Sequence, residues 1–115
     1  GNGFLTTHIL DTANGCPAAA LLVTLSREGE ASLLVSGLTN NDGRMDAPLL
    51  EGEAFQRGRY VIEFHVADYF RAKRTVLAEP PFLDIVPIHF SLATDEHYHV
   101  PLLVSPWSYS TYRGS

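Results

Sequence analysis

Residues 59–66, RYVIEFHV, alternate between side chains that suit a protein core and side chains that suit its surface. This period of two is the pattern of a half-buried β-strand, because successive side chains of a strand point to opposite faces of the sheet. The residues that would face the core are Tyr60, Ile62, Phe64 and Val66. Similar short stretches recur along the chain, and the seven prolines and nine glycines spread between them favour many short strands joined by turns.

Alternation and turn residues together predict seven strands, at 5–10, 19–25, 31–38, 59–66, 85–92, 97–104 and 107–112. An eighth, short edge strand is expected within 45–57, and Pro87 indicates that the strand at 85–92 also lies at an edge. Residues 67–75, ADYFRAKRT, break the alternation and predict about two turns of helix. The expected fold class is therefore an all-β sandwich, formed by a single domain over residues 1–115.

Charge and cysteine content argue against several classes of function. The formal net charge of −5 argues against a nucleic-acid partner, because phosphate binding needs a basic surface. No apolar run approaches the roughly 20 residues of a membrane span, so no membrane partner is expected. Cys16 is the only cysteine, which excludes an intrachain disulfide and a multi-cysteine zinc cluster and fits a reducing compartment.

The strand expected at 97–104, HYHVPLLV, carries two histidines on one face. Pleat parity assigns one set of side chains to the core, namely Tyr98, Val100, Leu102 and Val104. The opposite set is His97, His99, Pro101 and Leu103. In the strand expected at 5–10, the same parity puts Thr6, His8 and Leu10 on the face opposite Leu5, Thr7 and Ile9. A face that is half apolar and half imidazole suits an interface or a cleft better than bulk solvent.

The spacing of His97 and His99 allows three interpretations. Histidine is the side chain best suited to proton transfer near neutral pH, which favours catalysis. The same H-x-H spacing on a strand also occurs in metal sites, and a strand histidine is most often a plain surface or hydrogen-bonded residue. His65 and His89 are assigned to that last class, and Arg44 is by default a solvated surface charge. The residues alone predict a histidine-bearing face and leave its chemistry open.

Three stretches stand out together, namely 5–18 (LTTHILDTANGCPA), 39–44 (TNNDGR) and 97–115 (HYHVPLLVSPWSYSTYRGS). They resemble the 5-hydroxyisourate hydrolases, the transthyretin-related enzymes of urate breakdown. The final Tyr-Arg-Gly-Ser, Tyr112 to Ser115, is the most specific mark of that family. Transthyretin keeps the fold but lacks the histidines and this ending, so the chain resembles the enzyme branch.

The resemblance implies a fold, an assembly and a set of site residues. The fold is a transthyretin-like eight-stranded sandwich of two four-stranded sheets with one short helix. The assembly is a homotetramer, a dimer of dimers, with active sites in a channel between the dimers. The implied catalytic residues are His8, Arg44 and His99. Substrate binding would add Tyr112 and Ser115 to His8 and Arg44, with His97 and Arg113 in support and with neither cofactor nor metal.

The activity implied by the resemblance is hydrolysis of 5-hydroxyisourate to 2-oxo-4-hydroxy-4-carboxy-5-ureidoimidazoline, within urate degradation to allantoin. The main alternative is a small-ligand carrier that uses a transthyretin-like channel, and a second is a structural or adhesion-type sandwich without a pocket. A zinc site from His8, His97 and His99 is a further alternative. The expected location is the cytoplasm, or the periplasm or peroxisome if a targeting segment has been removed.

Overall fold

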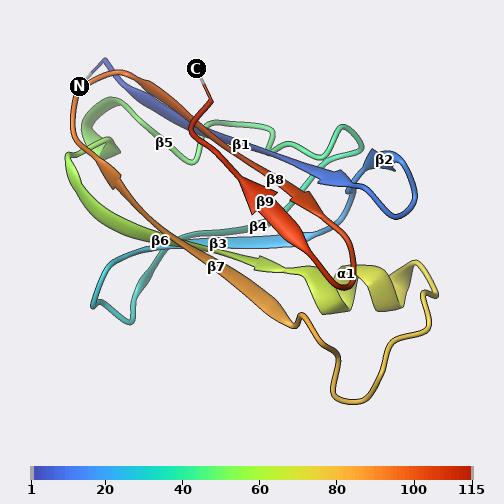
Figure 1. The fold of residues 1–115 in the computed structure, drawn as a ribbon. Helices are drawn as coiled ribbons and strands as arrows, with labels where there is room; N and C mark the ends of the chain where they lie inside the picture. The colour runs from blue at the N-terminus through green and yellow to red at the C-terminus, as the bar shows by residue number, and fades with distance from the viewer. Residues whose placement is uncertain (1, 115) are drawn as a thin grey trace.

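Residues 2–114 are described by a computed structural model, in which two β-sheets pack face to face (Figure 1). The first sheet has the order β2-β1-β8-β9, and β5 also pairs with β1. Its strands are β1 (Phe4–Asp11), β2 (Cys16–Pro17), β5 (Leu50–Glu51), β8 (His97–Val104) and β9 (Tyr109–Thr111). The second sheet has the order β4-β3-β6-β7. Its strands are β3 (Leu22–Arg27), β4 (Leu33–Leu38), β6 (Gly58–His65) and β7 (Ile85–Leu92).

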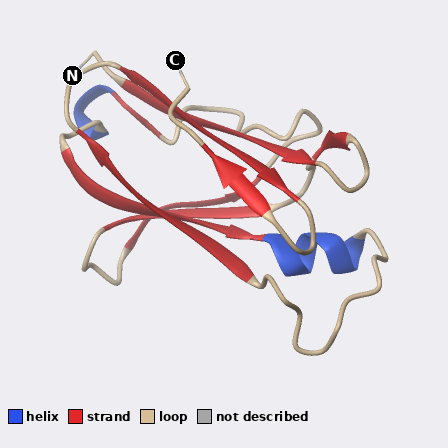
Figure 2. Cartoon of the chain, in the orientation of Figure 1, coloured by secondary structure: helices blue, strands red, loops and turns tan. Residues whose placement is uncertain are grey.

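Strands dominate the molecule, and the helices are short (Figure 2). The 3₁₀ helix η1 (Gly52–Ala54) follows β5, and the helix α1 (Val66–Ala72) follows β6 directly. This confirms the expected all-β sandwich with one short α-helix. Within residues 2–114, none of the helices is long and apolar enough to cross a membrane.

The structure differs from the expected strand list in a few places. The two-residue strand β2 was not expected, and it gives the first sheet one short member more than the predicted four. The strand expected from residue 19 begins only at Leu22, because Ala19 and Ala20 form a turn in which Ala20 has a φ of 57°. The expected short edge strand within 45–57 is β5, and β7 with Pro87 lies at an edge of its sheet, as predicted.

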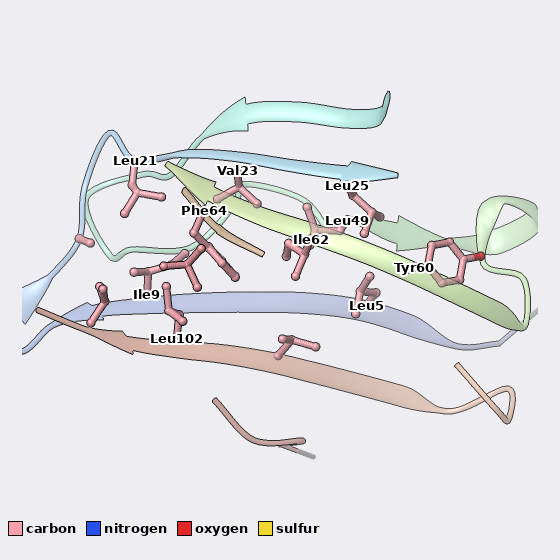
Figure 3. Packing of buried hydrophobic residues seen from close by; sticks show 14 of the residues in the cluster. Leu5, Ile9, Leu21, Val23, Leu25, Leu49, Tyr60, Ile62, Phe64 and Leu102 are labelled. Atoms are coloured by element: carbon pink, nitrogen blue, oxygen red, sulfur yellow. The ribbon is translucent and has the colours of Figure 1, made fainter. Parts of the chain in front are cut away.

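The core fills the space between the two sheets with side chains from both (Figure 3). Tyr60, Ile62 and Phe64 of β6 are fully buried, as their alternation predicted, and Val66 is buried as the first residue of α1. Each fully buried side chain of this size contributes about 1.5–3 kcal/mol through the area it removes from water. Burial on the inner faces therefore fixes which side chains of each strand remain on the outside.

Strands β1 and β8 lie side by side in the first sheet and run parallel. Their inner side chains join the core, and these include Leu5, Ile9, Val100 and Leu102. Their outer side chains form one continuous surface, and the register sets Thr6 beside His99 and His8 beside Pro101. This outer surface of β1 and β8 carries the candidate site.

Candidate active site

Four polar side chains of β1 and β8 share the outer surface of the sheet: Thr6, His8, His97 and His99. Pleat parity predicted this placement for both strands. His8 lies two residues beyond Thr6, which is the register partner of His99. With a strand spacing of about 4.8 Å and a rise of about 3.3 Å per residue, the Cα atoms of His8 and His99 are about 8 Å apart. A small molecule on this surface can therefore reach both imidazoles.

The loop before β5 brings Arg44 beside His8, at the edge of β1 that faces away from β8. An antiparallel bridge pairs His8 with Arg44, and the amide of Ile9 donates a 2.9 Å hydrogen bond to the carbonyl of Gly43. Gly43 has a φ of 74°, and a Cβ there would lie 2.5 Å from the carbonyl oxygen of Ile9. Only glycine permits this close approach. The loop is also held by Asn40, whose side-chain oxygen accepts a 3.1 Å hydrogen bond from the amide of Arg44.

The segment after β9 borders the site along β8. The amide of Gly114 donates a 2.7 Å hydrogen bond to the carbonyl of His99, which continues the pairing beyond β9. Arg113 donates from Nη2 to the carbonyl of His97 at 3.2 Å, and its guanidinium lies 4.0 Å from the centre of the Tyr98 ring. Arg113 therefore holds the backbone of β8 in place.

An open depression of about 730 Å³ lies between β8 and this final segment. It is lined by Glu96, His97, His99, Tyr112, Arg113 and Gly114. The Tyr112 side chain is 62% exposed at its border, while His8 and Arg44 continue the same surface across β1. The site of one protomer is thus open to solvent, with residues of β8 and of the segment after β9 on its sides.

Thr6 joins the two histidines of β8, and sequence reasoning missed it. Its hydroxyl oxygen lies 2.9 Å from Nε2 of His97 and 2.8 Å from Nδ1 of His99. Alternation in residues 5–10 predicts that Thr6 shares the face of His8, but threonine is an ordinary strand residue and its type alone does not indicate a function. No local signal in the sequence identifies it, because its position across from the H-x-H pair exists only once β1 and β8 are paired.

The electrostatics of the site favour neutral imidazoles. Burial lowers the pKa of His99 below its usual value, and the positive charge of Arg44 and the neighbouring His8 and His97 lower it further. Burial and Arg44 likewise lower the pKa of His8, against a smaller opposing effect of a hydrogen bond with the backbone of Asp42. A neutral imidazole keeps a lone pair free, so both rings can accept a proton at neutral pH.

The predicted site residues can now be placed. His8, Arg44 and His99 lie on one surface, and His97, Tyr112 and Arg113 border it, whereas Ser115 lies outside the described residues. Their roles in catalysis and binding stay predictions. His65 ends β6, and His89 in β7 lies 3.5 Å from a carboxylate oxygen of Glu28, both in the other sheet. Among residues 2–114, no three histidine, cysteine, aspartate or glutamate side chains are arranged as a metal site.

Comparisons with known proteins agree with this arrangement. Residues 5–114 match the model of the HIUase/Transthyretin family. The chain is 53% identical to a 5-hydroxyisourate hydrolase of Pseudomonas aeruginosa, over 98% of this chain and 92% of the relative. A solved Klebsiella pneumoniae 5-hydroxyisourate hydrolase is 35% identical with a TM-score of 0.83, over 98% of this chain and 99% of that one.

A solved (S)-allantoin synthase is 48% identical with a TM-score of 0.93, over 98% of this chain. The chain spans only 44% of that protein, so the likeness concerns one part of a longer polypeptide. Fold, site surface and near-complete matches lead to one conclusion: the chain belongs to the HIUase/Transthyretin family.

Proposed function

We propose that this protein hydrolyses 5-hydroxyisourate to 2-oxo-4-hydroxy-4-carboxy-5-ureidoimidazoline, a step of urate degradation to allantoin. The observation that carries the proposal is the convergence of two imidazoles, His8 and His99, and one guanidinium, Arg44, on a single surface. The Pseudomonas aeruginosa relative bears the name of this hydrolase and matches nearly the whole chain. Its name and this surface point to the same chemistry.

The first step is attack of water on a carbonyl carbon of the six-membered ring. Water is a poor nucleophile at neutral pH, so it must lose a proton to a general base as the new C–O bond forms. His8 and His99 suit this task because burial and Arg44 lower their pKa values and keep them neutral. One imidazole takes the proton, and the other orients the water or protonates the leaving nitrogen.

Attack places negative charge on the former carbonyl oxygen. The Arg44 guanidinium is always cationic and presents several N–H donors, so it stabilises that charge and holds the electron-rich substrate. The ring C–N bond then breaks, the nitrogen takes a proton, and a carboxylate remains. Tyr112 closes the substrate site with its hydroxyl, as we propose for Ser115. Arg113 holds β8 in place through the carbonyl of His97, and the His97 ring borders the site in support.

The carrier alternative predicts that ligands bind without turnover. A carrier needs no proton acceptors in its binding surface, whereas this surface carries imidazoles next to a guanidinium. The decisive experiment mixes the protein with freshly made 5-hydroxyisourate and follows its ultraviolet absorbance. Decay faster than the spontaneous reaction, in proportion to protein concentration, supports the hydrolase, and decay at the spontaneous rate refutes it.

We further propose that the sites are completed in a homotetramer, a dimer of dimers. The support is the open surface of one protomer together with exposed aromatic rings near the end of the chain, Trp107, Tyr109 and Tyr112. Such rings are typical of protein interfaces. A sizing column calibrated for mass tests this, because a tetramer elutes at four times 12.6 kDa. Elution as a monomer overturns the assembly.

A cytoplasmic location is also proposed, because a chain whose only cysteine is Cys16 needs no oxidising compartment. Fractionation of the source cells, with the protein detected by antibody, tests it. Recovery in an extracytoplasmic or organelle fraction overturns this location.

A further inference from the structure

The hydroxyl group of Thr6 lies between the two imidazole rings of β8. Its oxygen is 2.9 Å from Nε2 of His97 and 2.8 Å from Nδ1 of His99, so one hydroxyl bridges two imidazoles. A hydroxyl carries a single proton and can donate to only one of them. When Thr6 donates to one ring, the other ring must donate to Thr6. The tautomers of His97 and His99 are therefore linked through Thr6.

The linked arrangement that suits a base can be worked out atom by atom. A neutral His99 that accepts a proton at Nε2 must carry its own proton on Nδ1. The Nδ1–H then donates to the Thr6 oxygen, and the Thr6 hydroxyl donates to Nε2 of His97. In the opposite arrangement every donor and acceptor is exchanged, and His99 carries its proton on Nε2. In the first arrangement, Nε2 of His99 can accept a proton from the substrate side. In the second, the same atom can donate one.

We propose that Thr6 is a positioning residue that relays protons between His99 and His97, so that His99 alternates between base and acid. This rests on the proposed hydrolysis. When His99 takes a proton from water at Nε2, its Nδ1 proton passes to Thr6 and the proton of Thr6 passes to Nε2 of His97. His97 then releases its Nδ1 proton to solvent. The reverse sequence returns a proton through His99 Nε2 to the leaving nitrogen.

The charges around the relay explain why it is useful. His8 and the cation Arg44 lie beside His99, so an imidazolium held there is disfavoured. His97 is exposed and makes an edge-to-face contact with the Phe4 ring. The Arg113 guanidinium near its carbonyl lies 3.8 Å from the carboxylate of Glu96. The relay moves positive charge away from Arg44 and into solvent. His99 itself remains neutral before and after each transfer.

Thr6→Val and Thr6→Ser test the relay. Valine keeps the branched shape that suits a strand and removes the hydroxyl, whereas serine keeps the hydroxyl. Thr6→Val is expected to lower kcat about 10-fold or more with KM nearly unchanged, since well-placed proton transfer contributes about 10²–10⁴-fold. Thr6→Ser is expected to restore most of the rate. The control is Thr12→Val, because the Thr12 hydroxyl bonds to the carbonyl of Val104, away from the imidazoles.

An NMR readout needs no substrate and separates this proposal from the proposed function. Long-range ¹⁵N–¹H correlations report the tautomers of His97 and His99 in the intact protein at a pH where both are neutral. The wild type is expected to show complementary tautomers, and Thr6→Val is expected to lose that complementarity while Thr6→Ser keeps it. The relay is overturned if Thr6→Val leaves both kcat and the tautomers unchanged, or if Thr6→Ser is as slow as Thr6→Val. Absence of hydrolysis in the wild type would instead refute the proposed function.

Discussion

The backbone of Gly114 lies against the imidazole ring of His99. Its amide donates a 2.7 Å hydrogen bond to the His99 carbonyl, and a Cβ on Gly114 would lie 2.9 Å from Cδ2 of the ring. Thr6 contacts the same ring at Nδ1. The orientation of His99 is therefore fixed from two directions, by the strand partner Thr6 and by the backbone of Gly114.

Gly114→Ala is expected to lower kcat about 10-fold or more, because the added methyl displaces the His99 ring and a shift of about 1 Å can cost as much as 10²-fold. The measurement is steady-state hydrolysis with the thermal midpoint recorded alongside. The midpoint should change little, since Gly114 lies at the edge of the sheet. Full activity in this variant would show that the close approach of Gly114 does not position the ring.

His8→Ala, Arg44→Ala and His99→Ala are each expected to lower turnover by about 10²-fold or more, which is the range for lost proton transfer or oxyanion stabilisation. The matched control is His89→Ala, because His89 lies in the other sheet beside Glu28. It should keep the wild-type rate. Normal turnover in any of the first three variants would remove that residue from the catalytic set.

The pH dependence of kcat/KM should show an acid limb with its midpoint below 6.5, the usual pKa of histidine. Burial and the charge of Arg44 lower the pKa of both His8 and His99, so the neutral, proton-accepting forms persist to more acidic pH. Arg44→Gln should raise the pKa of His99, measured by an NMR titration that does not depend on activity. An unchanged or lower value would contradict the assigned electrostatics.

Stability at acid pH should depend on Asp11, a buried carboxylate that is 1% exposed. Its pKa lies below its usual 3.8, because hydrogen bonds from Asn14, Tyr69 and Ala13 outweigh the opposing effect of burial. The unfolded chain therefore binds this proton at a higher pH than the folded chain. The contribution of Asp11 to the free energy of unfolding is complete above about pH 4 and is lost as the pH falls below it.

Tyr69→Phe removes the 2.8 Å hydrogen bond to Oδ2 of Asp11 and should lower the free energy of unfolding at pH 7 by about 1.5–3 kcal/mol. Urea unfolding at one fixed protein concentration measures this, because the proposed assembly would make stability depend on concentration. The difference from wild type should shrink in acid, where Asp11 is protonated. An equal difference at both pH values would show that the charge of Asp11 is not involved.

Chelator treatment should leave hydrolysis unchanged, because every proposed step uses protein side chains and none uses a metal ion. The assay compares purified protein before and after prolonged exposure to EDTA. Loss of activity that added zinc restores would instead support the alternative metal site from His8, His97 and His99. That result would reassign the histidines from proton acceptors to ligands.

Much of the fold could be predicted because side-chain alternation and burial follow the same period. The alternation in β6 correctly identified Tyr60, Ile62 and Phe64 as core. The predicted start of β3 was wrong. Ala19 and Ala20 extend the apolar run in the sequence, but Ala20 adopts a positive φ in a turn. Pro101 lies on the outer face and is nevertheless buried, and Thr111 of β9 donates a hydrogen bond to its carbonyl. Periodicity assigns a face to each residue and does not say which strand covers it.

The site likewise combines features that a local pattern predicts with features that depend on contacts between distant segments. Parity placed His8 and His99 on outer faces, but the pairing of β1 with β8 depends on contacts across the whole chain. Arg44 was expected only through the family resemblance, because its position depends on the approach of Gly43 to Ile9 and not on any local pattern. Thr6 was missed because its role exists only once the two strands are paired.

The parallel pairing of β1 and β8 has a consequence for biosynthesis. Thr6 and His99 are in contact although they are 93 residues apart in the sequence. On the ribosome, β1 emerges long before its neighbour has been translated, so a nascent chain has no rudimentary version of the site. In the proposed mechanism, turnover begins only after β8 has been made and has paired with β1, and a proteolytic nick that releases either strand abolishes it. Specific activity is thus a sensitive gauge of the fraction of intact, fully matured molecules in a preparation.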